Sequence, residues 1–211
     1  MPDAAEVDGS ARQRRRRWKI FFELFILTLA ALIIISALHW FVLEPFVVSG
    51  DSMVPSFSSG QYLVIDEVTY YFHKPQRGDV IVFRYPLDPS QFFIKRLIGI
   101  PGDTVTIAHG VVSVRPKGSD TAYPITEPYV AAANRKDETS TITLSDDEYF
   151  VLGDNRNASF DSRTWGPVPG RYIIGQPVLR IFPLQTFTLF PGAYHFSLIA
   201  TGTPVLSTGT R

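Results

Sequence analysis

The apolar and polar positions divide the chain into two regions with different patterns. From residue 18 to residue 43 the sequence is almost unbroken apolar, and between Leu24 and Leu38 only Thr28 and Ser36 are polar. About 20 apolar residues are enough for a helix that crosses a bilayer. A buried core helix is the weaker interpretation, because the apolar residues cover every face of such a helix. The pattern therefore predicts a transmembrane helix over residues 18–43.

Basic residues precede this apolar segment and are absent directly after it. Arg12, the run 14–17 and Lys19 lie before or at its start, whereas residues 44–51 contain no lysine or arginine. The positive-inside rule then predicts that residues 1–17 are cytoplasmic and that the chain after residue 43 lies on the far side of the membrane. A cleaved signal peptide begins in a similar way, but this apolar segment is longer and no small-x-small site closes it.

The remainder of the chain has the pattern of an antiparallel β-rich domain. Short runs of β-branched and aromatic residues are separated by Gly, Pro and Asp, which is typical of strands and turns. The predicted strands are 46–48, 62–65, 79–84, 92–98, 104–107, 111–115, 141–144, 149–152 and 177–182. We therefore expect a mainly β, antiparallel fold over residues 44–211. Residues 115–147 are more polar and are predicted to be an insertion or flap on that core.

Composition removes several classes of function. The chain has 20 basic and 20 acidic residues, but the basic cluster before the apolar segment leaves the predicted β domain mildly acidic. That charge argues against nucleic-acid binding. The absence of cysteine excludes disulfides, thiolate metal sites and a cysteine nucleophile. The four histidines are scattered without a zinc-peptidase pattern, so neither a metal nor another cofactor is expected.

Three polar clusters in the predicted β domain carry candidate chemistry. The first, residues 49–56, directly follows the apolar segment, and the third, residues 153–166, is a loop rich in turn-forming residues. In the second, Lys95 interrupts an apolar strand, and alternation places Lys95 and Arg96 on opposite faces, so one of them must point toward the apolar side. Such a cation is either a gatekeeper of an edge strand or a desolvated lysine whose neutral amine is a base.

Together, and in this order after the apolar segment, the clusters resemble the type I signal peptidases. These are membrane-bound serine proteases that remove signal peptides from exported proteins. The motifs that carry the resemblance are SMVPS at 52–56, RGDVIVFRY at 77–85, IKR at 94–96, PGD at 101–103 and GDNRNASFDSRTWG at 153–166. The resemblance extends from the apolar segment to about residue 180, and it implies a fold of antiparallel β-sheets.

The resemblance also implies roles for individual residues. Ser52 would be the nucleophile and Lys95 the general base, and Ser159 would form a hydrogen bond with the lysine amine and orient it. Asp161 and Arg163 would form a supporting ion pair near the site. A lysine acts as a base near neutral pH only if its pKa falls by roughly 2–3 units, and desolvation by apolar neighbours has that effect.

One position departs from the pattern of some relatives. Where those relatives carry a serine that contributes to the oxyanion hole, this chain has Gly50. The hole is then expected to rest on backbone N–H groups, chiefly that of Ser52. Gly153 and Asp154 are expected to shape the loop that presents Ser159.

By the same resemblance, the substrate is an extended segment with small residues at the first and third positions before the cut. It is expected to pair as a strand with an exposed sheet edge. The residues matching the family's shallow pockets are Val48, Met53, Phe57, Phe93 and Ile94. The implied partners are signal peptides of exported preproteins, the lipid bilayer and a nearby secretion translocon. The implied location is the plasma membrane of a bacterium, with the catalytic domain outside the cytoplasm.

Two other interpretations remain open at the level of the sequence. A different Ser/Lys protease, such as a self-cleaving repressor, would carry a DNA-binding helical domain, and the sequence predicts none. A non-catalytic, membrane-anchored binding protein on the same fold is the alternative from another class. The intact Ser52, Lys95 and Ser159 argue against it, and a preprotein cleavage assay separates the two.

Overall fold

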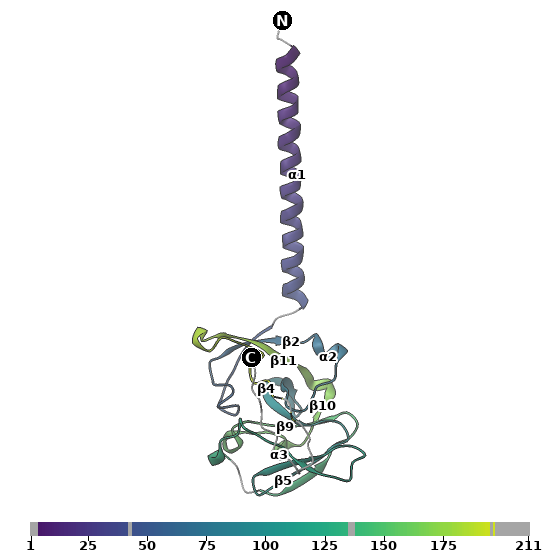
Figure 1. Ribbon diagram of the computed structural model, residues 1–211, viewed down its shortest axis with the longest axis vertical. Helices are drawn as coiled ribbons and strands as arrows, with labels where there is room; N and C mark the ends of the chain where they lie inside the picture. The colour runs from purple at the N-terminus through teal and green to yellow at the C-terminus, as the bar shows by residue number, and fades with distance from the viewer. Residues whose placement is uncertain (1–3, 42–43, 135–137, 195, 197–211) are drawn as a thin grey trace, which may run out of the picture. The chain divides into compact units, whose positions relative to one another are not determined.

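The chain divides into two compact units, residues 1–43 and 44–211. A computed structural model describes residues 4–41, 44–134, 138–194 and 196. In the first unit, helix α1 runs over Ala4–Phe41 (Figure 1). Its side chains from residue 15 to residue 33 are exposed. Within the described residues, no helix combines the length and hydropathy needed to cross a membrane. Residues 42 and 43, which end the membrane span predicted over 18–43, lie outside the described residues.

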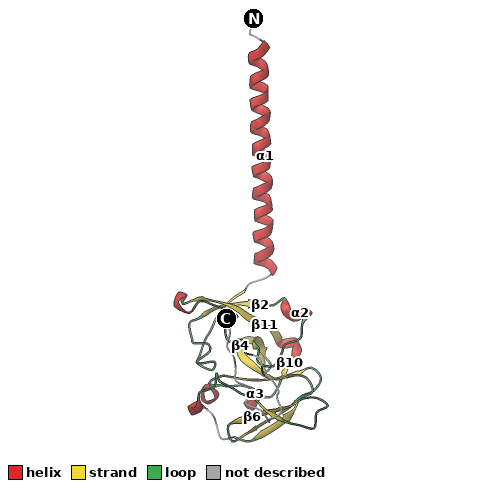
Figure 2. Cartoon of the chain, viewed as in Figure 1, coloured by secondary structure: helices red, strands yellow, loops and turns green. Residues whose placement is uncertain are grey.

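The described residues of the second unit form two antiparallel β-sheets, as the mainly β, antiparallel fold class predicted (Figure 2). In the larger sheet the strand order is β1-β2-β11-β3-β4-β9-β10, with β12 paired to β11. Its strands are β1 (Glu44–Val47), β2 (Tyr62–Asp66), β3 (Val80–Tyr85), β4 (Asp88–Gly99), β9 (Glu148–Leu152), β10 (Val168–Pro169), β11 (Ile173–Phe182) and β12 (Thr188–Leu189). The smaller sheet has the order β7-β6-β5-β8, built from β5 (Thr104–Ala108), β6 (Val111–Arg115), β7 (Tyr123–Pro124) and β8 (Ser140–Thr143).

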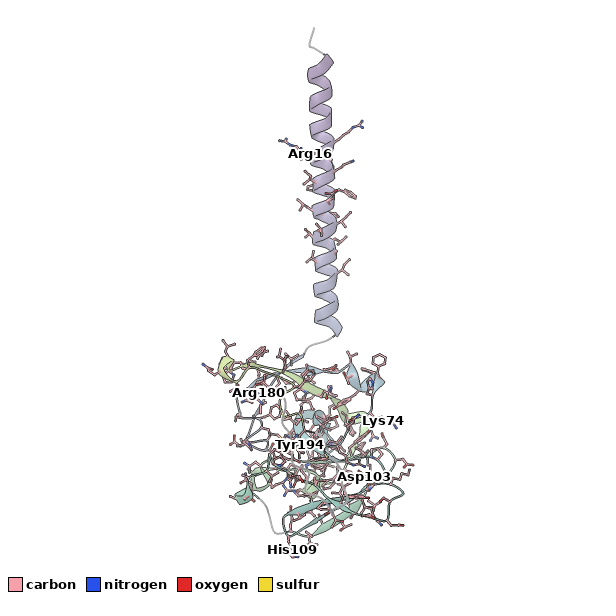
Figure 3. All side chains as sticks on the ribbon, in the orientation of Figure 1. Arg16, Lys74, Asp103, His109, Arg180 and Tyr194 are labelled. Atoms are coloured by element: carbon pink, nitrogen blue, oxygen red, sulfur yellow. The ribbon has the colours of Figure 1, made fainter. Side chains whose placement is uncertain are left out.

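Every strand that the sequence predicts overlaps a strand of the structure. The two-residue strands β7, β10 and β12 were not predicted, nor were the four-residue helices α2 (Thr69–Phe72) and α3 (Ser162–Trp165). The polar segment 115–147 contributes β7 and β8 to the smaller sheet, where β8 pairs directly with β5. His109 lies at the tip of the β5–β6 hairpin in that sheet (Figure 3).

Strand β4 organises the larger sheet around the candidate site. Its first part pairs only with β3 among the described strands, whereas from Arg96 onward it also pairs with β9. One apolar cluster, which includes Val48, Met53, Phe57 and Val82, packs against Ile94. A second cluster, which includes Ile81, Phe83, Leu97 and Val151, packs against Phe93. Burial against these two clusters fixes the strand that carries Lys95.

Candidate active site

Ser52 lies in a tight turn that follows β1. Gly50 begins this turn with a φ of 87°, a left-handed conformation that glycine adopts without steric strain. After Ser52, the side chains of Met53 and Phe57 are 1% and 0% exposed, and the Phe57 N–H donates to the Met53 carbonyl at 2.8 Å. From β11, Arg180 (Figure 3) donates through Nη2 to the Ser56 carbonyl at 2.6 Å. The nucleophile turn is therefore held by the apolar core on one side and by β11 on the other.

The side chain of Lys95 reaches Ser52 from the middle of β4. Its Nζ donates to Ser52 Oγ at 2.7 Å and to the backbone carbonyl of Ile94 at 3.0 Å. Lys95 is only 5% exposed, so its amine is almost completely removed from solvent. The structure thus brings together the two residues for which the resemblance implies catalytic roles.

Burial lowers the pKa of Lys95 to about 8, although the carboxylates of Asp161 and Asp154 act in the opposite direction. Desolvation prevails because an ammonium ion loses its hydration shell in this apolar site. A large fraction of the lysine is then neutral in mildly alkaline solution. In that form the amine has a lone pair that accepts a proton from the Ser52 hydroxyl.

Ser159 does not make the expected hydrogen bond with Lys95. Its Oγ is buried and forms no hydrogen bond of ordinary geometry with any described group. Lys95 Nζ donates instead to Ser52 Oγ and the Ile94 carbonyl. The hydroxyl does help to lower the pKa of Asp161, which places it near that carboxylate. Ser159 also packs tightly on Gly153, where an added Cβ would come within 2.2 Å of the hydroxyl oxygen.

Asp161 and Arg163 form the ion pair that the resemblance implied, and two hydrogen bonds join their side chains. Arg163 Nε donates to one carboxylate oxygen at 2.7 Å and Nη2 to the other at 2.9 Å. Burial alone would raise the pKa of Asp161, but the bonds and charge of Arg163 hold that pKa below its ordinary value. The Gly153 N–H also donates to Asp161, at 3.0 Å. The Asp161 carboxylate therefore fixes the loop that begins at Gly153. Because both of its oxygens accept hydrogen bonds and its pKa is low, it is poorly placed to act as a base.

A second buried ion pair lies beside the base, and sequence reasoning did not identify it. Arg96 donates to Asp154 through Nε at 2.8 Å and through Nη2 at 2.7 Å, and both residues are almost completely buried. The Ser56 hydroxyl donates to the same carboxylate at 2.5 Å. The sequence required one of Lys95 and Arg96 to point toward apolar surroundings, and both are in fact buried. The clue was a second cation in an apolar strand, which requires a buried acid.

A cavity of about 290 Å³ opens beside Ser52 and Lys95. Of the five residues that the resemblance implies for the substrate pockets, Val48, Phe93 and Ile94 line this cavity. Met53 and Phe57 do not, because both side chains are in the core beneath the nucleophile turn. The lining residues that were not predicted include Phe46, Leu63, Val82, Phe92, Ala158 and Phe160.

The backbone around the nucleophile offers a donor for a developing oxyanion. The Ser52 N–H donates to no other described group, whereas the Gly50 N–H donates to Ser59 Oγ at 3.4 Å. Within the described residues, no group of three or more acidic or histidine side chains is arranged to hold a metal ion. A hydroxyl in contact with a buried, partly neutral amine, next to a free backbone N–H, is suited to acyl transfer.

Comparison with known proteins agrees with this chemistry. Residues 21–182 match the family described as signal peptidase, peptidase S26. A probable signal peptidase I-1 of Synechocystis sp. is 37% identical over 187 residues, which cover 82% of this chain and 92% of that protein. The signal peptidase I of Leptolyngbya laminosa is 36% identical over 153 residues, covering 69% and 71%. The signal peptidase I of Bacillus caldolyticus is 32% identical over 184 residues, covering 83% and 94%.

Proposed function

The chain belongs to the signal peptidase family, peptidase S26, and we propose that Ser52 and Lys95 perform its removal of signal peptides. One observation carries the proposal. The 2.7 Å contact joins the Ser52 hydroxyl to an amine that is buried and has a pKa of about 8. No histidine belongs to any of the motifs, so this lysine is the base that the serine has within reach.

The reaction follows from what each group can donate or accept. Neutral Lys95 takes the proton from Ser52 Oγ while that oxygen attacks the carbonyl carbon of the scissile peptide bond. The Ser52 N–H stabilises the negative charge that develops on the carbonyl oxygen. The lysine ammonium then gives its proton to the leaving amine as the C–N bond breaks, which leaves an ester on Ser52. A water molecule, deprotonated by Lys95, hydrolyses that ester and restores the serine.

Two unpaired strand edges support binding of the substrate as an added strand. Among the described strands β1 pairs only with β2, and β4 pairs only with β3 between residues 92 and 95. Both segments contribute to the wall of the cavity next to Ser52. An extended peptide between these edges gains main-chain hydrogen bonds. Val48, Leu63 and Ile94 leave room there for small side chains, so we propose Ala-x-Ala-like sites.

The test is cleavage of a preprotein by the purified full-length chain. We expect a single cut after a small-x-small sequence, identified by mass spectrometry of both products. Ser52→Ala should lower turnover by at least about a thousandfold, because Ser52 carries the only described hydroxyl that is hydrogen-bonded to Lys95 Nζ. A parent that binds the preprotein without cutting it would favour the binding-protein alternative, and full turnover by Ser52→Ala would exclude Ser52 as nucleophile.

We propose that this peptidase acts at the bacterial plasma membrane, near the translocon that delivers its substrates. Two features support attachment to lipid. The first is the apolar sequence after the basic cluster of the N-terminal unit, which favours a single-pass anchor with residues 1–17 in the cytoplasm. The second is a group of exposed apolar side chains on or near β1, β2, β11 and β12 of the second unit. They are Val47, Tyr62, Phe182, Leu184, Phe187, Leu189 and Phe190.

Protease added to intact spheroplasts tests this location. If the second unit lies outside the cytoplasm, an antibody against it should detect its digestion, while a cytoplasmic marker protein stays intact. Protection of the second unit until the membrane is lysed would show the opposite orientation. Recovery of the whole protein in the fraction free of membranes would contradict attachment altogether.

A further inference from the structure

The segment between β6 and β8 contacts the loop that carries Ser159 and Asp161 through a buried ion pair. Arg156 donates to Glu127 through both terminal nitrogens, with Nη1 at 3.3 Å from Oε2. The side chain of Glu127 is 0% exposed and that of Arg156 is 5% exposed. A pair so far from solvent is costly to assemble, since both charges lose their hydration. The pair joins the segment to residues 153–166, called here the catalytic loop because it carries Ser159 and Asp161.

Arg156 also donates to Gly153, which packs against the nucleophile turn. Its Nε donates to the Gly153 carbonyl at 3.0 Å. Gly153 itself has no free space, because a Cβ added there would be 2.5 Å from the Ser52 carbonyl oxygen and 2.2 Å from Ser159 Oγ. A displacement of Arg156 would therefore be transmitted through Gly153 to the nucleophile turn and to Ser159.

Further contacts join the same two segments. Asn157 Nδ2 donates to the Ala133 carbonyl at 2.9 Å, and Arg163 Nη1 donates to Glu138 at 2.6 Å. On its other side, the catalytic loop contacts the nucleophile turn, where the Asn155 N–H donates to the Ser52 carbonyl at 3.0 Å. The loop is thus held between the nucleophile turn on one side and Glu127, Ala133 and Glu138 on the other.

Tyr129 extends the contact to the neighbourhood of the base. Its hydroxyl donates to Glu127 at 3.3 Å, and its ring lies 3.9 Å from the guanidinium carbon of Arg96. Arg96 directly follows Lys95 in β4 and is buried with Asp154. Glu127 and Tyr129 are therefore connected to Gly153, which packs against the Ser52 turn, and to Arg96, which follows Lys95.

From these contacts we propose that Glu127 is a positioning residue for the hydrolysis. It fixes the Arg156 guanidinium, which holds the Gly153 carbonyl and so keeps the catalytic loop against Ser52. This inference rests on the proposed function of the Ser52–Lys95 pair. It assigns Glu127, within the segment 115–147 that the sequence predicted to be an insertion or flap, to the support of the catalytic site.

The test compares kcat, KM and thermal midpoints of full-length variants on one preprotein, each measured well below its unfolding temperature. Glu127→Gln should lower kcat at least tenfold and change KM less than twofold, because binding edges remain while the reacting groups shift. Its midpoint should also fall, since Arg156 is left buried without its counter-charge. Asp146→Asn is the matched control, because it removes an exposed pair with Lys117 (86% and 67% exposed) from the same part of the chain. Asp146→Asn should match the parent in both kinetic constants.

The double variant Glu127→Met/Arg156→Met separates positioning from stability. It removes both buried charges, so its midpoint should lie near that of the parent. We still expect a kcat at least tenfold below the parent, because the Gly153 carbonyl has lost its donor. A double variant with a kcat within twofold of the parent would overturn the inference. Ser52→Ala is included in the same assay, and turnover by that variant, or none by the parent, would instead reject the proposed function.

Discussion

Lys95→Arg is expected to lower turnover of a preprotein by at least about a thousandfold while the protein remains folded. Arginine keeps the positive charge but stays protonated at any accessible pH, so it has no lone pair for the Ser52 proton. Loss of a general base costs about 10²–10⁴ in rate. Because Lys95 Nζ contacts Ser52 Oγ at 2.7 Å, this loss should be as large as that of Ser52→Ala. The measurement is turnover by the purified variant, with folding followed by circular dichroism.

Two companion variants make that result interpretable. Lys95→Met fills the apolar space without supplying a base and should be folded and equally inactive. Lys74→Arg makes the same chemical change at an exposed lysine and should retain the turnover of the parent. If Lys95→Arg kept a tenth of the parental rate, a cost of only about 1.4 kcal/mol in the barrier, the lysine would have a structural role.

Gly153→Ala is expected to reduce turnover by about a hundredfold and to destabilise the second unit. The added methyl group would lie 2.5 Å from the Ser52 carbonyl oxygen and 2.2 Å from Ser159 Oγ, so the nucleophile turn or the loop must move. A displacement of about 1 Å is enough to cost 10²-fold in catalysis. Overpacking of this kind typically costs about 1–3 kcal/mol of stability. Turnover and a thermal melt measure the two effects.

Gly118→Ala is the control for the loss of a glycine as such. Gly118 has a φ of 77° and no atom within 4 Å of an added Cβ, so the substitution strains the backbone without crowding the site. It should lower the thermal midpoint slightly and leave kcat unchanged. Equal kinetic effects of the two substitutions would show that the tight fit around Gly153 has no role in catalysis.

The strands were predictable because local patterns specify them, and the catalytic pair because ordered motifs resemble a known family. Alternation and turn residues determine where each strand lies, and the predicted run 111–115 coincides with β6. The pairing of Ser52 with Lys95 was implied by that resemblance, although 43 positions separate the two residues. Periodicity alone could not have joined them, since it contains no information on which strands meet in space.

Exposure of single apolar side chains was less predictable. Val48, Met53 and Phe57 all lie close to Ser52 in the sequence and were all expected to line the pockets. The nucleophile turn directs Met53 and Phe57 into the core, where they are 1% and 0% exposed. An apolar residue beside a catalytic serine fits a pocket wall and a core position equally well. The expected bond between Ser159 and Lys95 is not formed either, because it depends on side-chain orientation that a motif does not specify.

The buried ion pairs escaped prediction for a related reason. Glu127 and Arg156 are 29 positions apart. No spacing rule predicts that a glutamate in a polar segment will form an ion pair with an arginine in a distant loop. Residues 115–147 read as an insertion because their composition is polar. Their contacts with the catalytic loop come from the tertiary arrangement of two sheets, and only coordinates contain that information.

The pH dependence of kcat/KM tests the central claim, a serine activated by a neutral lysine, most directly. Burial lowers the pKa of Lys95 to about 8, so the active neutral amine should increase with pH through that value. The account predicts a rise of about tenfold per pH unit well below pH 8 and a plateau above it. The rise should be absent from the residual activity of Lys95→Met. A parental profile that is flat through this range, or that keeps rising toward the ordinary lysine pKa of about 10.4, would contradict it.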